Sequence, residues 1–136
     1  MYKHILAATD FSDLGGRALQ KASELAIGLG AKLTLVHVMV SEESASPMYA
    51  EHEVRAHVEK LEKQLQQAIP PGHHVHVDVE VRVGQPAQEL LAAMAQHGAD
   101  LLVISSNGEK GFTRWLLGSV TDRVVRGAER DVLVVT

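Results

Sequence analysis

Apolar runs of strand length alternate with segments of helical periodicity along the chain, and this alternation restricts the fold more than any other feature. Five runs are expected as β-strands, and they span residues 4–9, 32–39, 75–83, 100–105 and 131–136. The first, fourth and fifth of these runs are almost continuously apolar. Such runs are typical of strands that are buried on both faces of a parallel sheet.

Helices are expected between the strands. In the first, alanines and leucines recur at helical spacing after Ser12, a suitable N-cap, and the pattern stops at Gly30. The second carries apolar residues at helical spacing over residues 54–69, and Pro70 ends it because proline cannot continue the hydrogen-bond ladder.

The third helix is expected to begin at Pro86, in its first turn, and to end at Gly98. A fourth is expected from about Ser119. Its valines are expected to face inward, namely Val120, Val124 and Val125.

The order β-α-β-α-β-α-β-α-β places the chain in the α/β class. We expect one domain, residues 1–136, with an open doubly wound sheet of five parallel strands and helices on both faces. In such sheets, ligands bind beyond the carboxyl ends of the strands, where neighbouring connections leave to opposite faces. For the strand order 3-2-1-4-5 this crevice lies between strands one and four.

Composition limits the classes of partner. The 136 residues carry a formal net charge of −4, and their 13 basic residues are scattered, which argues against nucleic acid or an anionic membrane as the main partner. The chain has no cysteine, so disulfides and thiolate metal sites are excluded and a cytoplasmic location is expected. The N-terminus leads directly into an apolar strand without a secretory-type leader.

A glycine-rich segment over residues 105–119 links the fourth strand to the fourth helix. Gly108, Gly111 and Gly118 punctuate it. Glycines permit positive φ and close backbone approach, and the N–H groups at a helix start present partial positive charge, so a nucleotide phosphate is the expected guest. The polar loop after the first strand, residues 9–12, should converge on the same crevice.

These segments resemble the universal stress protein family over essentially the whole chain. The similarity is carried by residues 5–12, 33–38 and 100–104, and by the glycine segment that ends in Gly118-Ser119-Val120. The resemblance implies a Rossmann-like fold of the adenine-nucleotide alpha-hydrolase type and a role in stress response or signalling. It also implies a homodimer.

The ATP-binding branch of that family has the pattern glycine, two residues, glycine, nine residues, glycine and a small hydroxyl residue. Gly108, Gly118 and Ser119 match its last three positions, while Ser105 stands where the family has its first glycine. The resemblance implies ATP as ligand, with or without Mg²⁺, and a site whose residues fall into a few groups. Asp10 would accept hydrogen bonds from the ribose, and the adenine would contact Ala8, Thr9 and Val38. The phosphates would contact Gly108, Gly111, Gly118 and Ser119, and the remaining site residues are Ser105, Asn107 and Val120.

Ser105 and Glu109 leave an alternative open. A Cβ at position 105 would crowd the phosphates, or would strain the backbone if a left-handed conformation is required there. Alternatively, the Ser105 hydroxyl would donate to a phosphate oxygen. The carboxylate of Glu109 would repel phosphate at close range. The alternative is therefore a dimeric interaction module without nucleotide. Weak ATP hydrolysis or phosphotransfer is a third hypothesis, for which no catalytic residue is assigned.

Several side chains have a second, structural interpretation. Asp10 has the position of a turn or capping carboxylate, and Ser119 that of a helix cap. His73, His74 and His76 offer a transition-metal site, but a solvated start to the third strand is the preferred reading.

The last strand, residues 131–136, is apolar and lies at a sheet edge in this topology. Unpaired edge backbone invites pairing with a second copy across a two-fold axis. We therefore expect a homodimer through this strand. The alternative is a short edge protected by Glu129, Arg130 and Asp131.

Overall fold

The computed structural model describes residues 1–40, 47–72, 76–107 and 117–136. Within these ranges the chain forms a five-stranded sheet in the order β3-β2-β1-β4-β5, and every neighbouring pair is parallel. The strands are β1 (His4–Ala8), β2 (Lys32–Met39), β3 (Val77–Val83), β4 (Leu101–Ser105) and β5 (Asp131–Val135). The expected α/β class, strand number and strand order are confirmed.

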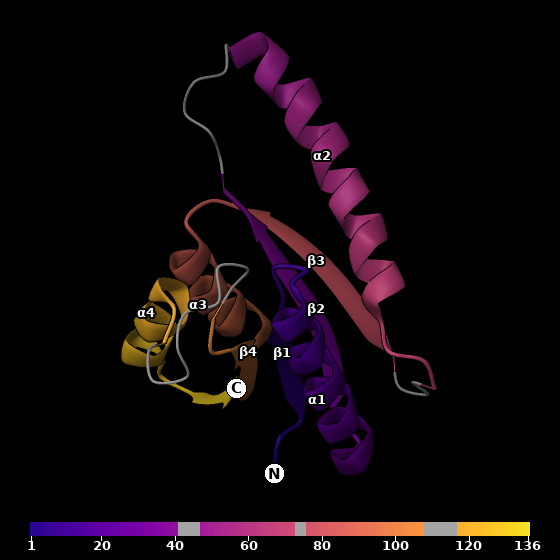
Figure 1. The fold of residues 1–136 in the computed structure, drawn as a ribbon, viewed down its shortest axis with the longest axis vertical. Helices are drawn as coiled ribbons and strands as arrows, with labels where there is room; N and C mark the ends of the chain where they lie inside the picture. The colour runs from indigo at the N-terminus through magenta and orange to yellow at the C-terminus, as the bar shows by residue number, and fades with distance from the viewer. Residues whose placement is uncertain (41–46, 73–75, 108–116) are drawn as a thin grey trace.

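Four helices connect these strands: α1 (Asp13–Leu29), α2 (Pro47–Ala68), α3 (Pro86–His97) and α4 (Ser119–Gly127). They cover both faces of the sheet (Figure 1). Alternate residues of β1 explain this division, because Ile5 and Ala7 pack with α1 and α2 while Leu6 and Ala8 pack with α3 and α4. None of the described helices is long and apolar enough to cross a membrane.

The helix ends follow the sequence signals. The Ser12 hydroxyl accepts a hydrogen bond from the Gly15 N–H at 3.1 Å, which caps α1. Gly30 and Gly98 take left-handed conformations, with φ of 65° and 61°, directly after α1 and α3. Pro86 is the first residue of α3. The predicted starts and stops of these helices are confirmed.

Helix α4 differs from expectation in one residue. Val124 is fully buried and Val120 packs against the same apolar cluster, but Val125 is 42% exposed. Successive helical residues are about 100° apart, so the position after Val124 turns out of the narrow stripe that Thr121 and Val124 bury. The prediction that Val125 faces inward was wrong.

Strands β1 and β4 are neighbours at the centre of the sheet. The chain leaves β1 toward α1 on one face and reaches α4 on the other face after β4. The switch point therefore lies between these two strands, as predicted. Strand β5 lies at one edge of the sheet and β3 at the other.

Candidate functional site

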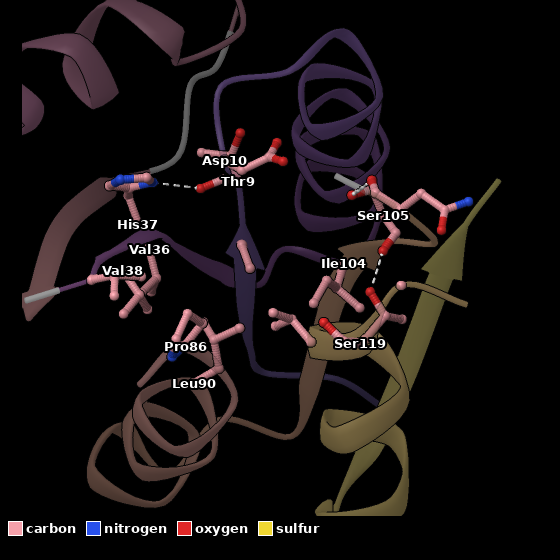
Figure 2. A pocket seen from close by; sticks show the side chains of 16 residues that line it. Thr9, Asp10, Val36, His37, Val38, Pro86, Leu90, Ile104, Ser105 and Ser119 are labelled. Atoms are coloured by element: carbon pink, nitrogen blue, oxygen red, sulfur yellow. Dashed lines mark hydrogen bonds between the residues drawn. The ribbon is translucent and has the colours of Figure 1, made fainter. Parts of the chain in front are cut away.

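A cavity of about 420 Å³ opens at the carboxyl ends of β1, β2 and β4 (Figure 2). The described part of the chain contributes residues from the ends of these three strands, from the start of α3 and from the start of α4. Its position is the switch point of the sheet, where a doubly wound protein is expected to bind its ligand.

Most of the predicted site residues meet at this cavity. The structure places nine of them in its wall: Ala8, Thr9, Asp10, Val38, Ser105, Asn107, Gly118, Ser119 and Val120. Gly108 and Gly111 lie outside the described residues, as does Glu109.

One wall of the cavity is aliphatic. It is formed by the end of β2 and the start of α3, and Figure 2 shows Val36 and Val38 close to Pro86 and Leu90. Leu90 and Val36 are buried and belong to the apolar cluster beneath the cavity. This wall suits a flat, weakly polar ring and offers no charge to it.

Asp10 lies in a tight turn at the end of β1. One carboxylate oxygen, Oδ1, accepts hydrogen bonds from the N–H of Ser12 at 3.0 Å and from the Ser12 hydroxyl. Asp10 therefore does stabilise the turn, which is the structural interpretation that the sequence allowed. This role does not exclude ligand binding, because the Asp10 side chain is exposed in the cavity and Oδ2 has no hydrogen-bond partner among the described residues.

Ser105 is the last residue of β4 and is buried, with 8% of its surface exposed. Its hydroxyl donates to the backbone carbonyl of Asn107 at 2.9 Å. Among the described residues, Phe11 is the only non-glycine with positive φ. Of the possibilities left open at Ser105, left-handed strain does not occur, because strand geometry at the end of β4 accommodates a Cβ.

Gly118 precedes α4 and is its N-cap, with φ of −60° and ψ of 158°. Any residue can adopt this conformation, so Gly118 does not need the freedom of glycine. A Cβ there would lie 3.4 Å from the carbonyl oxygen of Ser106, which is ordinary contact. What glycine provides at this position is close access to the backbone.

Ser119 is the first residue of α4 rather than its cap. The capping role that the sequence also allowed for Ser119 falls instead to Gly118. The N–H groups of Ser119, Val120 and Thr121 have no partner within the helix, because the first intrahelical bond runs from the Asp122 N–H to the Gly118 carbonyl. All three residues line the cavity, so the positive end of the α4 dipole lies at its wall.

The α3 wall is tied to β3 by a charged cluster of four side chains, which are Glu80, Arg82, Glu89 and His97. The Arg82 guanidinium contacts Glu80 at 2.5 Å and Glu89 at 3.2 Å, and His97 also contacts Glu80. Burial alone would raise the pKa of Glu80, but hydrogen bonds from His97 and Arg82 outweigh burial and hold its pKa below the ordinary value. Glu89 lies one residue before Leu90, so the cluster helps to fix the aliphatic wall.

The model of the universal stress protein family matches residues 1–136. The chain belongs to the universal stress protein family.

The chain matches relatives over most of their own length. Universal stress protein MJ0531 of Methanocaldococcus jannaschii is 32% identical, with 99% of this chain and 82% of that protein covered. Universal stress protein YxiE of Bacillus subtilis is 31% identical, with 99% of both chains covered. The solved structure of protein MJ0577 has a TM-score of 0.85 at 29% identity and covers 99% of this chain and 96% of its own. Two other universal stress protein structures, 24% and 20% identical with TM-scores of 0.69 and 0.66, agree in fold.

Of the three histidines before β3 in this universal stress protein, the described residues include His76. His76 is exposed and its Nε2 lies 2.7 Å from Asp78 Oδ1, which fits the solvated start of β3. His73 and His74 lie outside the described residues. In the described ranges, no group of three or more histidine and carboxylate side chains could hold a metal ion.

Some cavity residues of this universal stress protein were not predicted as site residues. They come mostly from the ends of β2 and β4 and from α3 and α4, and they are Val36, His37, Val40, Pro86, Leu90, Ile104 and Thr121. All of them except Val40 lie within the strands and helices that the sequence predicts, where an apolar pattern indicates packing rather than ligand contact. The available signal was topological: any residue at the carboxyl end of a strand beside the switch point is a candidate.

Proposed function

We propose that this protein binds an adenine nucleotide in the switch-point cavity, that the nucleotide is ATP with or without Mg²⁺, and that the bound state serves stress response or signalling. One observation carries the proposal. The cavity combines an aliphatic wall that includes Val38, a carboxylate oxygen of Asp10 that has no partner among the described residues, and the N-terminus of α4 at Ser119 (Figure 2).

Each part of a nucleotide has a matching surface in this arrangement. The adenine ring lies against Val36, Val38 and Leu90. The ribose hydroxyls donate to Asp10, whose Oδ1 is already fixed by Ser12. The phosphates lie at the start of α4, where backbone N–H groups and the helix dipole favour negative charge.

Ligands in related structures support this choice of ligand class. One of the two fold-level neighbours is a universal stress protein in complex with cAMP, and the other, from Archaeoglobus fulgidus, is in complex with dAMP. Both ligands are adenine nucleotides. The preference for a triphosphate is our proposal and derives from the glycine pattern that ends in Gly118-Ser119.

A nucleotide-free interaction module is favoured by one contact. The Ser105 hydroxyl is directed to the Asn107 carbonyl, so it is not directed to a phosphate oxygen. This contact leaves the Asp10 carboxylate and the α4 start untouched, so we keep nucleotide binding as the primary proposal.

The protein is also proposed to be a homodimer that pairs through β5. This strand is at the sheet edge, and its side chains from Val132 to Val135 are only half-buried in the single chain. A second copy would satisfy the free backbone groups of the edge and cover these side chains. The proposed location is the cytoplasm, in line with the absence of cysteine from the sequence.

Asp10→Ala tests the nucleotide proposal against Asp13→Ala, a matched control in the first turn of α1 that does not line the cavity. A hydrogen bond to a charged group is worth about 1.5–3 kcal/mol, so Asp10→Ala should weaken ATP binding about tenfold or more. For 2′,3′-dideoxy-ATP, which lacks the ribose donors, wild type and Asp10→Ala should bind alike. Equal ATP affinity of the Asp10 and Asp13 variants would contradict the proposed ribose contact.

A further inference from the structure

Phe11 lies between Asp10 and Ser12 and has a φ of 65°. A bulky side chain in this left-handed region costs about 1–2 kcal/mol, and such strain persists only where surrounding contacts hold it. The turn that presents Asp10 to the cavity is therefore not the conformation that its residues prefer locally. Hydrogen bonds within the turn and contacts from outside it must together stabilise this conformation.

Phe11 packs against the apolar cluster that includes residues of β1 and α1, and two more specific contacts also hold it. Its N–H donates to the Thr9 hydroxyl at 3.0 Å, within the turn. Its ring lies against the imidazole of His37, with ring centroids 4.6 Å apart and planes inclined by 39°. His37 belongs to β2, so this second contact comes from a different strand.

His37 also contacts the first residue of the turn. Its Nδ1 lies 2.8 Å from the backbone carbonyl oxygen of Thr9 (Figure 2). A carbonyl oxygen only accepts, so Nδ1 carries the hydrogen and this tautomer is fixed. One imidazole thus engages the turn at both Thr9 and Phe11, on either side of Asp10.

We propose that His37 is a positioning residue of the candidate nucleotide site. By donating to Thr9 and packing on Phe11 it holds residues 9–12 in the strained turn that points the Asp10 carboxylate toward the ribose. This inference rests on the proposed function, and it assigns to β2 a part in ligand recognition beyond the apolar contact of Val36 and Val38. His37 acts through Thr9 and Phe11, so it is not a catalytic residue.

Two substitutions separate the positioning role from simple packing. His37→Leu fills similar space but has no donor. His37→Asn retains an N–H near the place of Nδ1, so it can still donate to the Thr9 carbonyl. His57→Leu, at an exposed position on α2, controls for the loss of a histidine.

The first readout needs no nucleotide: hydrogen exchange of the Phe11 and Ser12 amides in the free protein. One hydrogen bond is worth about 1 kcal/mol, so exchange should be about fivefold faster in His37→Leu and near wild type in His57→Leu. It should be clearly slower in His37→Asn than in His37→Leu, because asparagine keeps the donor although it loses the ring on Phe11. Equal exchange in the leucine and asparagine variants would overturn the positioning role.

The second readout is the affinity for ATP and for 2′,3′-dideoxy-ATP. We expect His37→Leu to bind ATP about fivefold more weakly, His37→Asn to recover most of that loss, and the loss for the dideoxy analogue to be clearly smaller than the loss for ATP, although His37 also lines the cavity. Equal losses for both nucleotides would overturn the proposed action through Asp10. Failure of the wild-type protein to bind ATP at all would instead contradict the proposed function, and the exchange measurement would still decide whether His37 holds the turn.

Discussion

The hydroxyl of Thr121 donates a hydrogen bond to the backbone carbonyl of Ser105, with 2.7 Å between the two oxygens. Both residues are buried, at 4% and 8% exposure, and sixteen positions separate them in the chain. This bond ties the first turn of α4 to the end of β4. It sets where the α4 N-terminus lies relative to the rest of the cavity.

Thr121→Val should destabilise the protein more than Thr121→Ser. Valine keeps the shape but leaves the buried Ser105 carbonyl without its donor, which costs about 1–3 kcal/mol. Serine keeps the donor and loses one methyl group, worth about 1 kcal/mol. Urea unfolding of the two variants measures the difference. A valine variant as stable as wild type would show that the bond contributes nothing to stability.

Gly118→Ala should cost no more than about 1 kcal/mol of stability, because its Cβ meets only ordinary contacts and the backbone conformation is open to all residues, although alanine is a poorer N-cap than glycine. Gly118→Leu should abolish measurable ATP binding, because its side chain fills space at the phosphate end of the cavity. Calorimetric titration of both variants checks this. Undiminished ATP binding by the leucine variant would contradict the proposed place of the phosphates at the start of α4.

The cluster around Glu80 predicts an acid dependence of stability. The pKa of Glu80 in the folded protein lies below its ordinary value of 4.5. Its contribution to stability is therefore fully present above about pH 4.5 and is lost as the pH falls through the folded pKa. The stability gap between wild type and Glu80→Gln should narrow on acidification, as urea unfolding at a series of pH values would show.

A suitable control for the Glu80 experiment is Asp122→Asn, which removes an exposed ion pair with Arg126 at 3.1 Å. An exposed pair of this kind contributes about 0.3–0.5 kcal/mol. A gap for Glu80→Gln that stayed constant down to pH values below 4 would contradict the proposed role of its ionised form.

The β5 edge predicts a dimer in solution. One chain has a mass of 14.7 kDa, and sedimentation equilibrium should return about twice that value. A proline in place of Val134 should lower the dimer fraction, because proline has no N–H to donate to a pairing strand and disturbs the strand backbone. A wild-type protein that sediments as a single chain at every concentration would contradict pairing through β5.

Local signals in the sequence predicted most of the fold, because they act over a few residues. Ser12, Gly30, Pro86 and Gly98 mark helix ends through their own backbone and side-chain chemistry. The wrong prediction at Val125 also concerns a few residues only. A short helix such as α4 buries a narrow stripe, and the sequence does not show where that stripe ends.

The site was harder to predict in its details. Asp10, Ser119 and the strand ends were placed correctly at the cavity by topology. The contact of His37 with Thr9 joins residues 28 positions apart, and the left-handed φ of Phe11 follows from that tertiary contact and not from its residue type. Neither could be derived from local pattern. The direction of the Ser105 hydroxyl toward Asn107 likewise depends on the chain that follows β4.

Direct titration of the purified protein with ATP, with and without Mg²⁺, tests the central claim. The account predicts saturable binding with one nucleotide per chain, competed by AMP and weakened in Asp10→Ala but not in Asp13→Ala. A folded protein that shows no binding of ATP at millimolar concentration would contradict this account. The switch-point cavity would then have to serve another ligand.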